Sequence, residues 1–249
     1  MEDEVVWRQY GFELRRSDLE FLKGPCFITD RLIDFYFQGF LSAIGARDIS
    51  FVPSSVTYWL ARSTNARDVA DCLYHFNRYP GNLVLFPLNN DRDLDRIDVR
   101  PDTHWSLLVF DSFQRAFIHF DSPREESDDY SLELALRIYD NVRVRLERME
   151  RMEDNGDEDL GERKPYEFRR VWAADPAKGF NKYDCGLHVI RMAFLICCWY
   201  LDERGSIGDH GYEALIQEME PAEEGTAREM IKDAILDITG EDIMKLLHK

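Results

Sequence analysis

The sequence has few cysteines, and their spacing excludes two common kinds of small-domain framework. Its 249 residues include five cysteines, at Cys26, Cys72, Cys185, Cys197 and Cys198. An odd number without regular spacing matches neither a disulfide framework nor a set of zinc ligands. We therefore expect reduced thiols, as in a protein of the cytoplasm, the nucleus or both.

Long apolar runs and the motifs of metal or nucleotide chemistry are also missing. No apolar run approaches the length that a bilayer-spanning helix needs, and the start, Met1 to Glu4, does not resemble a secretory signal. The sequence has no His-Glu-x-x-His motif, no paired Cys-x-x-Cys and no glycine-rich phosphate loop. We therefore expect no membrane segment, no metal and no cofactor.

Basic residues are scarce relative to acidic ones. There are 31 lysines and arginines against 48 aspartates and glutamates, a formal net charge of −17. This balance argues against a nucleic acid as the main partner and favours a basic protein, although an acidic surface also serves solubility. One run of arginines, Arg143, Arg145, Arg148 and Arg151, alternates with glutamates, which indicates a solvated helix face rather than a binding patch.

The segment 181–186, which reads Asn-Lys-Tyr-Asp-Cys-Gly, carries the strongest chemical signal. An apolar run without Gly or Pro follows it as far as Ile196, which predicts a buried helix with Cys185 in its first turn. The unpaired N–H groups of a helix start favour an anion, and the thiolate is the reactive form of cysteine. Cys185 is therefore a candidate nucleophile; the alternative is a buried, inert cysteine.

Two strands upstream could supply the partners of such a nucleophile. Residues 103–111 and 116–122 are rich in β-branched and aromatic side chains and are joined by a turn-like Ser-Phe-Gln-Arg, which predicts a hairpin. The hairpin would place His104, at the start of one strand, beside Asp121, at the end of the other. A thiol, a base and an orienting carboxylate are the parts of a nucleophilic triad.

Two other histidines compete for the role of base. His188 follows Cys185 by three residues on the predicted helix, and His119 shares a strand face with Asp121. We expect His188 to be packed and His119 to have a structural role, and we favour His104.

The rest of the chain predicts one α+β domain over residues 1–249. Helices are expected at 31–46, 54–76, from 131 onward, at about 186–201 and at 227–247, and strands at 82–88 and 168–173. The charged loop 89–102 is expected to be exposed, either as a lid or as a merely solvated loop. The acidic segment at about 153–164 is expected to be flexible.

These motifs resemble those of a known family, the sentrin/SUMO-specific (Ulp-type) cysteine proteases. The family has His-Trp, then an Asp that closes the next strand, then Asp-Cys-Gly, and this chain has His104-Trp105, Asp121 and 184–186 in that order. Residues 13–18, 25–30 and 51–53 resemble the short members that act on the modifier NEDD8. The resemblance implies a papain-like fold with a mixed sheet between helices and cleavage after the C-terminal Gly-Gly of a ubiquitin-like modifier.

The resemblance also implies roles for further residues. Trp105 and Phe27 would form a narrow tunnel for the Gly-Gly tail, although each could equally be a core residue. The family usually has a glutamine as oxyanion-hole donor where this chain has Gly179, so Asn181 or the Cys185 backbone N–H would have to help. Phe27 also replaces the usual tryptophan.

The expected partner is a ubiquitin-like modifier and its conjugates. NEDD8 is favoured, and we expect a monomeric enzyme without a cofactor. Modifiers of this class expose basic residues near their tails, so the candidate contacts are Asp18, Asp30, Asp91 and Asp93. Two alternatives remain: a SUMO-specific isopeptidase of the same fold, and a catalytically weak module that binds a ubiquitin-like protein.

Overall fold

A computed structural model describes most of the chain. The described residues are 3–9, 11–45, 48–64, 69, 82–91, 103–122, 129–153, 164–172, 183–202, 211–212, 214 and 224–239. Several predictions therefore lie outside the described residues, namely those for Gly179, Asn181, Asp93, nearly all of the acidic segment 153–164 and most of the loop 89–102.

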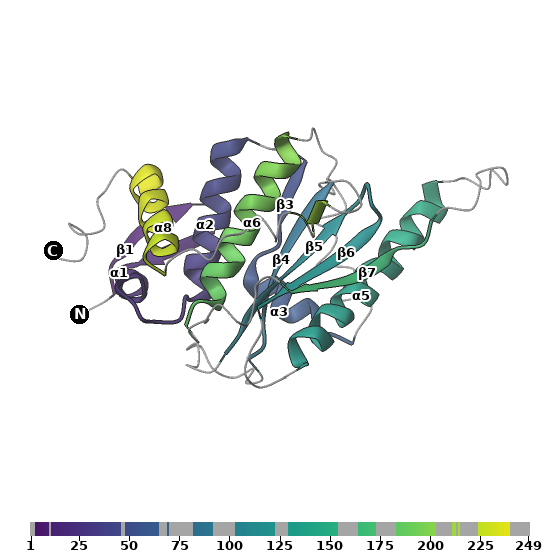
Figure 1. The fold of residues 1–249 in the computed structure, drawn as a ribbon, viewed down its shortest axis with the longest axis horizontal. Coiled ribbons are helices and arrows are strands. Elements are labelled where there is room, and N and C mark those ends of the chain that lie inside the picture. The colour runs from purple at the N-terminus through teal and green to yellow at the C-terminus, as the bar shows by residue number, and fades with distance from the viewer. Residues whose placement is uncertain are drawn as a thin grey trace.

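A five-stranded mixed sheet forms the centre of the molecule (Figure 1). Its strands, in spatial order, are β3 (Ile49–Phe51), β4 (Leu83–Asn89), β5 (Trp105–Asp111), β6 (Ala116–Asp121) and β7 (Glu167–Trp172). The three central strands are antiparallel, whereas β3 pairs with β4 and β6 with β7 in parallel. The sequence therefore predicted the β5–β6 hairpin correctly.

Helices cover both faces of this sheet, as Figure 1 shows. On one face lie α2 (Asp30–Ile44), α6 (Cys185–Asp202) and α8 (Glu224–Thr239), and on the other α3 (Ser54–Leu60) and α5 (Tyr130–Glu153). Alternate strand residues enter the two cores: Leu107 and Val109 face α2 and α6, while Leu108 and Phe110 face α3 and α5. Both layers exclude water from the sheet, which explains why β4 to β6 are apolar almost throughout.

The N-terminal segment forms a small unit outside α2. A hairpin of β1 (Val5–Gln9) and β2 (Phe12–Arg15) leads into α1 (Arg16–Glu20) and a 3₁₀ turn (Phe21–Lys23). Trp7 anchors the hairpin on α2, since its ring meets that of Phe35 edge to face with centroids 4.8 Å apart. This unit places the segment after Lys23 on the side of the molecule where α6 begins.

Two expectations about helices are wrong. The helix expected at 54–76 is not continuous, because α3 ends at Leu60 and residues 61–64 are not helical; Val69 is helical, and the other residues of this range lie outside the described part of the chain. The helix α6 is long and apolar enough to span a membrane by length and composition, contrary to the prediction that no such run exists. In the structure 56% of α6 is buried inside the protein, as expected of a core helix that packs on a sheet.

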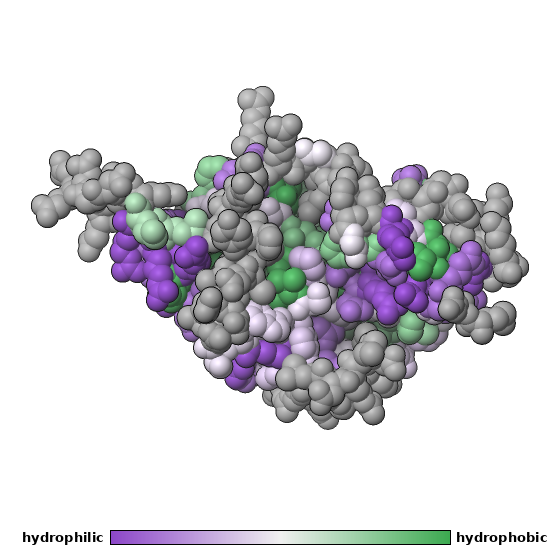
Figure 2. Space-filling model, turned by 180° about the vertical axis from the view of Figure 1, so that it is seen from behind, coloured by the Kyte–Doolittle hydropathy of each residue, from purple (hydrophilic) through white to green (hydrophobic). Residues whose placement is uncertain are grey.

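The face of the molecule that is turned away from the viewer in Figure 1 carries both hydrophilic and apolar side chains. Figure 2 shows hydrophilic areas toward both ends of this face, with smaller apolar areas among them. The large apolar side chains that are most exposed include Met152, at 76%, and Phe113, at 59%. Single exposed apolar residues of this kind are ordinary for a folded protein.

Candidate active site

The hairpin of β5 and β6 brings a histidine and a carboxylate together. The Nε2 atom of His104 lies 2.6 Å from Oδ1 of Asp121, and both side chains are about 5% exposed. The His104 backbone is also fixed, because its N–H donates to the side chain of Asn90 (2.6 Å) and its carbonyl accepts from the Asn90 N–H (3.0 Å). The imidazole is therefore held from two directions.

The surroundings of His104 favour its charged form. Burial by itself lowers the pKa of His104, but the hydrogen bond to Asp121 and the neighbouring Cys185 thiol outweigh it and raise the pKa to about 9. Since Nε2 faces Asp121, the other ring nitrogen, Nδ1, is left for Cys185. An imidazolium beside a thiol stabilises the thiolate, which is the nucleophilic form.

Asp121 is kept ionised by two cations. Burial raises the pKa of Asp121, but His104, together with Arg170, reverses this effect and holds the pKa below its usual value. Arg170 approaches the second carboxylate oxygen at 3.3 Å from the neighbouring strand β7. A carboxylate in this state can orient the imidazole without taking its proton.

Cys185 is the first residue of α6, as the sequence predicted, and its side chain is buried. Two other cysteines on this helix lie in a different environment, since burial raises the pKa of both Cys197 and Cys198. Their thiols are therefore poor nucleophiles. Cys26 is half-buried, and Cys72 lies outside the described residues.

Gly186 allows two neighbouring groups to approach the start of α6. A β-carbon at this position would lie 2.9 Å from Cβ of Ile28 and 3.4 Å from Cδ1 of Trp105. These two residues are tied together, because the Trp105 indole N–H donates to the Ile28 carbonyl (3.1 Å). The glycine after the nucleophile is thus required by close packing.

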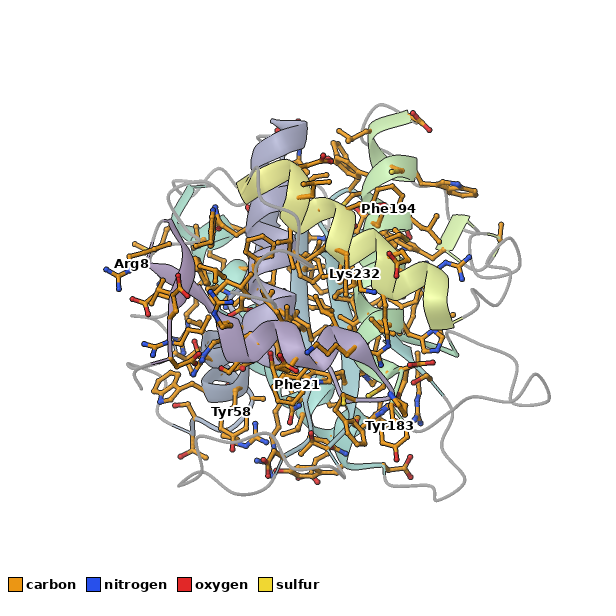
Figure 3. All side chains as sticks on the ribbon, turned by 90° about the vertical axis from the view of Figure 1, so that its left-hand side faces the viewer. Arg8, Phe21, Tyr58, Tyr183, Phe194 and Lys232 are labelled. Carbon is orange, nitrogen blue, oxygen red and sulfur yellow. The ribbon has the colours of Figure 1, made fainter. Side chains whose placement is uncertain are left out.

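Both aromatic residues proposed for the tunnel lie near Cys185. Trp105 is nearly buried and, like Cys185, lines a small pocket. Phe27 is half-buried and packs edge to face on Tyr183, with ring centroids 5.0 Å apart. Tyr183, two residues before Cys185, lies near the lower edge of the molecule in Figure 3.

The competing histidines are in different surroundings from His104. His119 is fully buried and its Nε2 lies 3.0 Å from the Ser106 hydroxyl, while burial lowers its pKa to about 4. His188 lines the pocket beside Cys185, but burial, aided by Arg191, lowers its pKa to about 4 as well. In neither does a hydrogen bond to an aspartate raise the pKa, as it does in His104.

The acidic residues proposed as partner contacts differ in exposure. Asp18 is buried, accepts a hydrogen bond from the Arg15 N–H (2.8 Å) and pairs with Arg31, so we do not carry it forward as a contact. Asp30 is exposed at the start of α2, and Asp91 is half-buried. Among the described residues, no group of three His, Cys, Asp or Glu side chains is placed to hold a metal.

Sequence reasoning missed several residues that support the site: Asn90, Arg170, Tyr183 and Arg228. Asn90 and Arg170 hold His104 and Asp121, and the side chain of Arg228 lies 3.6 Å from Asp184. Tyr183 was visible in the sequence beside the nucleophile. The others come from separate elements and carry no motif, so their spacing gave no signal.

Comparison with known proteins identifies the family. Residues 80–201, which include His104, Asp121 and Cys185, match the C-terminal catalytic domain of the Ulp1 protease family. NEDD8-specific protease 1 of Arabidopsis thaliana is 26% identical, over 98% of each chain. Residues 80–201 therefore form a catalytic domain of the Ulp1 protease type. Human sentrin-specific protease 8 is 27% identical, over 88% of this chain and 91% of its own.

Solved structures of Ulp1-type proteases have the same fold. The yeast Ulp1 protease domain in complex with Smt3, the yeast ortholog of SUMO, gives a TM-score of 0.57 at 16% identity, over 96% of this chain and 89% of that one. The Xanthomonas campestris effector XopD bound to ubiquitin gives 0.54 at 17% identity, over 84% and 92%. The α+β architecture with a mixed central sheet is therefore that of the Ulp1 family, whose members are cysteine peptidases.

Proposed function

We propose that this protein is a cysteine protease that cleaves after the C-terminal Gly-Gly of a ubiquitin-like modifier, with NEDD8 as its preferred modifier. The observation that carries the proposal is the 2.6 Å contact of His104 with Asp121 beside Cys185 at the start of α6. These groups are a base, its orienting carboxylate and a thiol in mutual reach.

The first half of the reaction forms a thioester. His104 takes the proton of Cys185, and the thiolate attacks the carbonyl carbon of the terminal glycine. The backbone N–H of Cys185 lies in the first turn of α6, where such groups have no intrahelical partner and can donate to the oxyanion. His104 then gives its proton to the departing amine, and the tetrahedral intermediate collapses.

The second half of the reaction releases the modifier. A water molecule gives a proton to His104 and attacks the thioester carbonyl, and the thiol of Cys185 is restored. Asp121 remains ionised throughout and stabilises the charged imidazole. The residues supply acid, base and nucleophile, so the proposed reaction uses no cofactor.

The aromatic residues near Cys185 explain a preference for a tail without side chains. In this proposal Trp105 and Phe27 line the approach to Cys185, together with Ile28, whose carbonyl accepts from the Trp105 indole N–H. Two glycines would pass where a larger residue would collide. The acidic composition and the exposed Asp30 suit a modifier with basic residues near its tail.

NEDD8 is favoured over SUMO because the relative that matches 98% of this chain is a NEDD8-specific protease. A SUMO isopeptidase of the same fold is the second candidate, and a weakly active binding module the third. We propose action in the cytoplasm, the nucleus or both, where the described cysteines would remain free thiols.

The test is covalent capture by a panel of modifiers. NEDD8, SUMO and ubiquitin, each with a C-terminal electrophile, are incubated with the wild-type protein and with Cys185→Ala. We expect the NEDD8 probe to form an adduct fastest, at Cys185, and we expect no adduct with the variant.

Three other outcomes would overturn parts of the proposal. Faster capture by SUMO would favour the second candidate. Binding of a modifier without any adduct would favour the binding module. An adduct that maps to Cys26, Cys72, Cys197 or Cys198 would refute Cys185 as the nucleophile.

A further inference from the structure

A buried arginine on the last described helix reaches two parts of the active site. The guanidinium of Arg228, on α8, donates to the carbonyls of Phe21 and Cys26, each at 2.7 Å. Its side chain is only 5% exposed. Charge-assisted hydrogen bonds of a buried guanidinium are among the stronger polar contacts in a protein, so they fix the segment that supplies the carbonyls.

The same guanidinium faces the turn that holds the nucleophile. Arg228 Nη2 lies 3.6 Å from Oδ1 of Asp184, whose backbone carbonyl accepts the His188 N–H (2.9 Å) in the first turn of α6. The side chain also lies against Gly24, where an added β-carbon would be 3.0 Å from Arg228 Nε. Arg228 therefore fills the space between the segment 24–26 and Asp184.

Two of these contacts, at Cys26 and Asp184, are adjacent to residues of the proposed channel, that is, the tunnel for the Gly-Gly tail. Cys26 precedes Phe27 and Ile28, and the Ile28 carbonyl accepts the Trp105 indole N–H. Asp184 precedes Cys185. Figure 3 looks onto α8, which carries the labelled Lys232, with Phe21 and Tyr183 below it.

We propose that Arg228 is a positioning residue that holds the channel wall, segment 26–28, at a fixed distance from the Cys185 turn. The proposal rests on the proposed function, because the wall matters only if a tail passes between it and Cys185. Without the guanidinium, two buried carbonyls and one carboxylate lose a shared cation, and the wall can shift relative to the thiol. A shift of about 1 Å in the reacting carbonyl is enough to lower a rate about 100-fold.

The predicted effect separates substrate positioning from thiol chemistry. Asp121 and Asn90 hold His104, the base, and none of the hydrogen bonds described above joins these residues to Arg228. Alkylation of Cys185 by iodoacetamide, a small reagent that needs no channel, should therefore stay within about 3-fold of wild type in Arg228→Met, while kcat for a modifier fusion falls about 10- to 100-fold. KM should change little, because most of the modifier surface would bind elsewhere.

Two further variants make the test specific. Arg228→Lys keeps the charge, but one ammonium cannot reproduce the planar fork between both carbonyls, so kcat should be intermediate. Lys232→Met is the control, because Lys232 lies one turn later on α8 and pairs only with the exposed Glu229 (2.6 Å) among the described contacts. Thermal unfolding shows which variants are folded at the assay temperature.

Hydrogen exchange provides a readout that needs no modifier. In folded Arg228 variants, amides of residues 24–28 and 183–185 should exchange faster than in wild type and in Lys232→Met. Unchanged exchange and kcat in a folded Arg228→Lys or Arg228→Met protein would overturn the proposal. A proportional loss of alkylation and cleavage would also overturn it, since the thiol itself would then be disturbed. Wild-type protein that cleaves no modifier would instead defeat the proposed function.

Discussion

The backbone of His104 is fixed by Asn90, the residue after β4, through both the side chain and the backbone N–H of Asn90. Asn90 binds both the N–H and the carbonyl of His104, so the position of the imidazole does not depend on the bond to Asp121 alone. Loss of the carboxylate would therefore leave the base near the thiol, whereas loss of the imidazole would remove the base itself.

This difference predicts unequal effects of two substitutions. His104→Ala should lower kcat by about 100- to 10,000-fold, because a general base is absent, and Asp121→Asn should leave more activity. Steady-state cleavage of a NEDD8 fusion measures both. His119→Ala and His188→Ala serve as comparisons and should affect kcat much less once the folded fraction is accounted for. Loss of activity in either comparison that matches His104→Ala would show that the wrong base was assigned.

Gly186 provides a second test at the residue scale. Gly186→Ala should lower the free energy of unfolding by about 1–3 kcal/mol and also lower kcat, because the new methyl group displaces Ile28 or Trp105 beside the thiol. Gly45→Ala is the matched control. The φ of Gly45, +60°, strains any side chain, but among the described residues no atom outside its own chain neighbours and helix backbone lies within 4 Å of an added β-carbon. This variant should lose stability and keep its activity. Equal kcat in the two variants would contradict the packing argument.

At this scale the sequence predicted a base, a carboxylate and a nucleophile but not the residues that hold them. Order and spacing identified His104, Asp121 and Cys185, and the structure brings these three together. Arg170 reaches Asp121 only because β7 pairs in parallel with β6, and this pairing is not encoded in any local motif. The burial of Asp18 and its pairing with Arg31 of α2 likewise arise from packing that no local motif indicates.

At the level of the elements, the junction of α2 with α3 contains a buried carboxyl group, that of Asp34. The carboxylate of Asp34, on α2, accepts from both the N–H (2.9 Å) and the hydroxyl (2.6 Å) of Ser54, the first residue of α3. Burial raises the pKa of Asp34 to about 7 in spite of these two bonds. The start of α3 is thus held by a group that titrates near neutral pH.

Stability should respond to this titration. Between about pH 4 and pH 7 the folded protein keeps a proton on Asp34 that the unfolded chain releases, so a rise in pH favours unfolding. Asp34→Asn should therefore reduce the loss of unfolding free energy from pH 5 to pH 8, by up to about 3 kcal/mol. Urea titrations at both pH values measure it. Asp30→Asn, an exposed aspartate on the same helix, should leave the difference unchanged, and an unchanged difference in Asp34→Asn would disprove the assignment.

The elements themselves were predicted well where they are long and periodic. The helices α2, α5 and α6 and the strands β4 to β7 lie close to their expected ranges. The helix α3 is shorter than expected because Ala61 and Arg62 form a turn after it, although their sequence favours helix. The short strand β3 and the N-terminal hairpin were missed, because pairing partners rather than composition define them.

For the whole molecule, the net charge of −17 predicts how an encounter depends on salt. A modifier with a basic tail region should be attracted over a distance that shrinks as ionic strength rises. Raising the salt from about 0.05 M to about 0.5 M should increase KM for the NEDD8 fusion several-fold and leave kcat nearly constant. A salt effect on kcat alone would contradict this view. Iodoacetamide alkylation is the control, since a neutral reagent is not steered.

The separations of the site residues along the chain have a consequence for biosynthesis. His104 and Asp121 are 17 positions apart in one hairpin, whereas the contacts of Arg228 with Phe21 and Cys26 span 207 and 202 positions. Because synthesis proceeds from the N-terminus, His104 and Asp121 leave the ribosome first, Cys185 follows after β7, and Arg228 follows later with α8. A nascent chain that has exposed only the hairpin still lacks Cys185. If Arg228 has the positioning role proposed above, full proteolytic activity is expected only after α8 has left the ribosome.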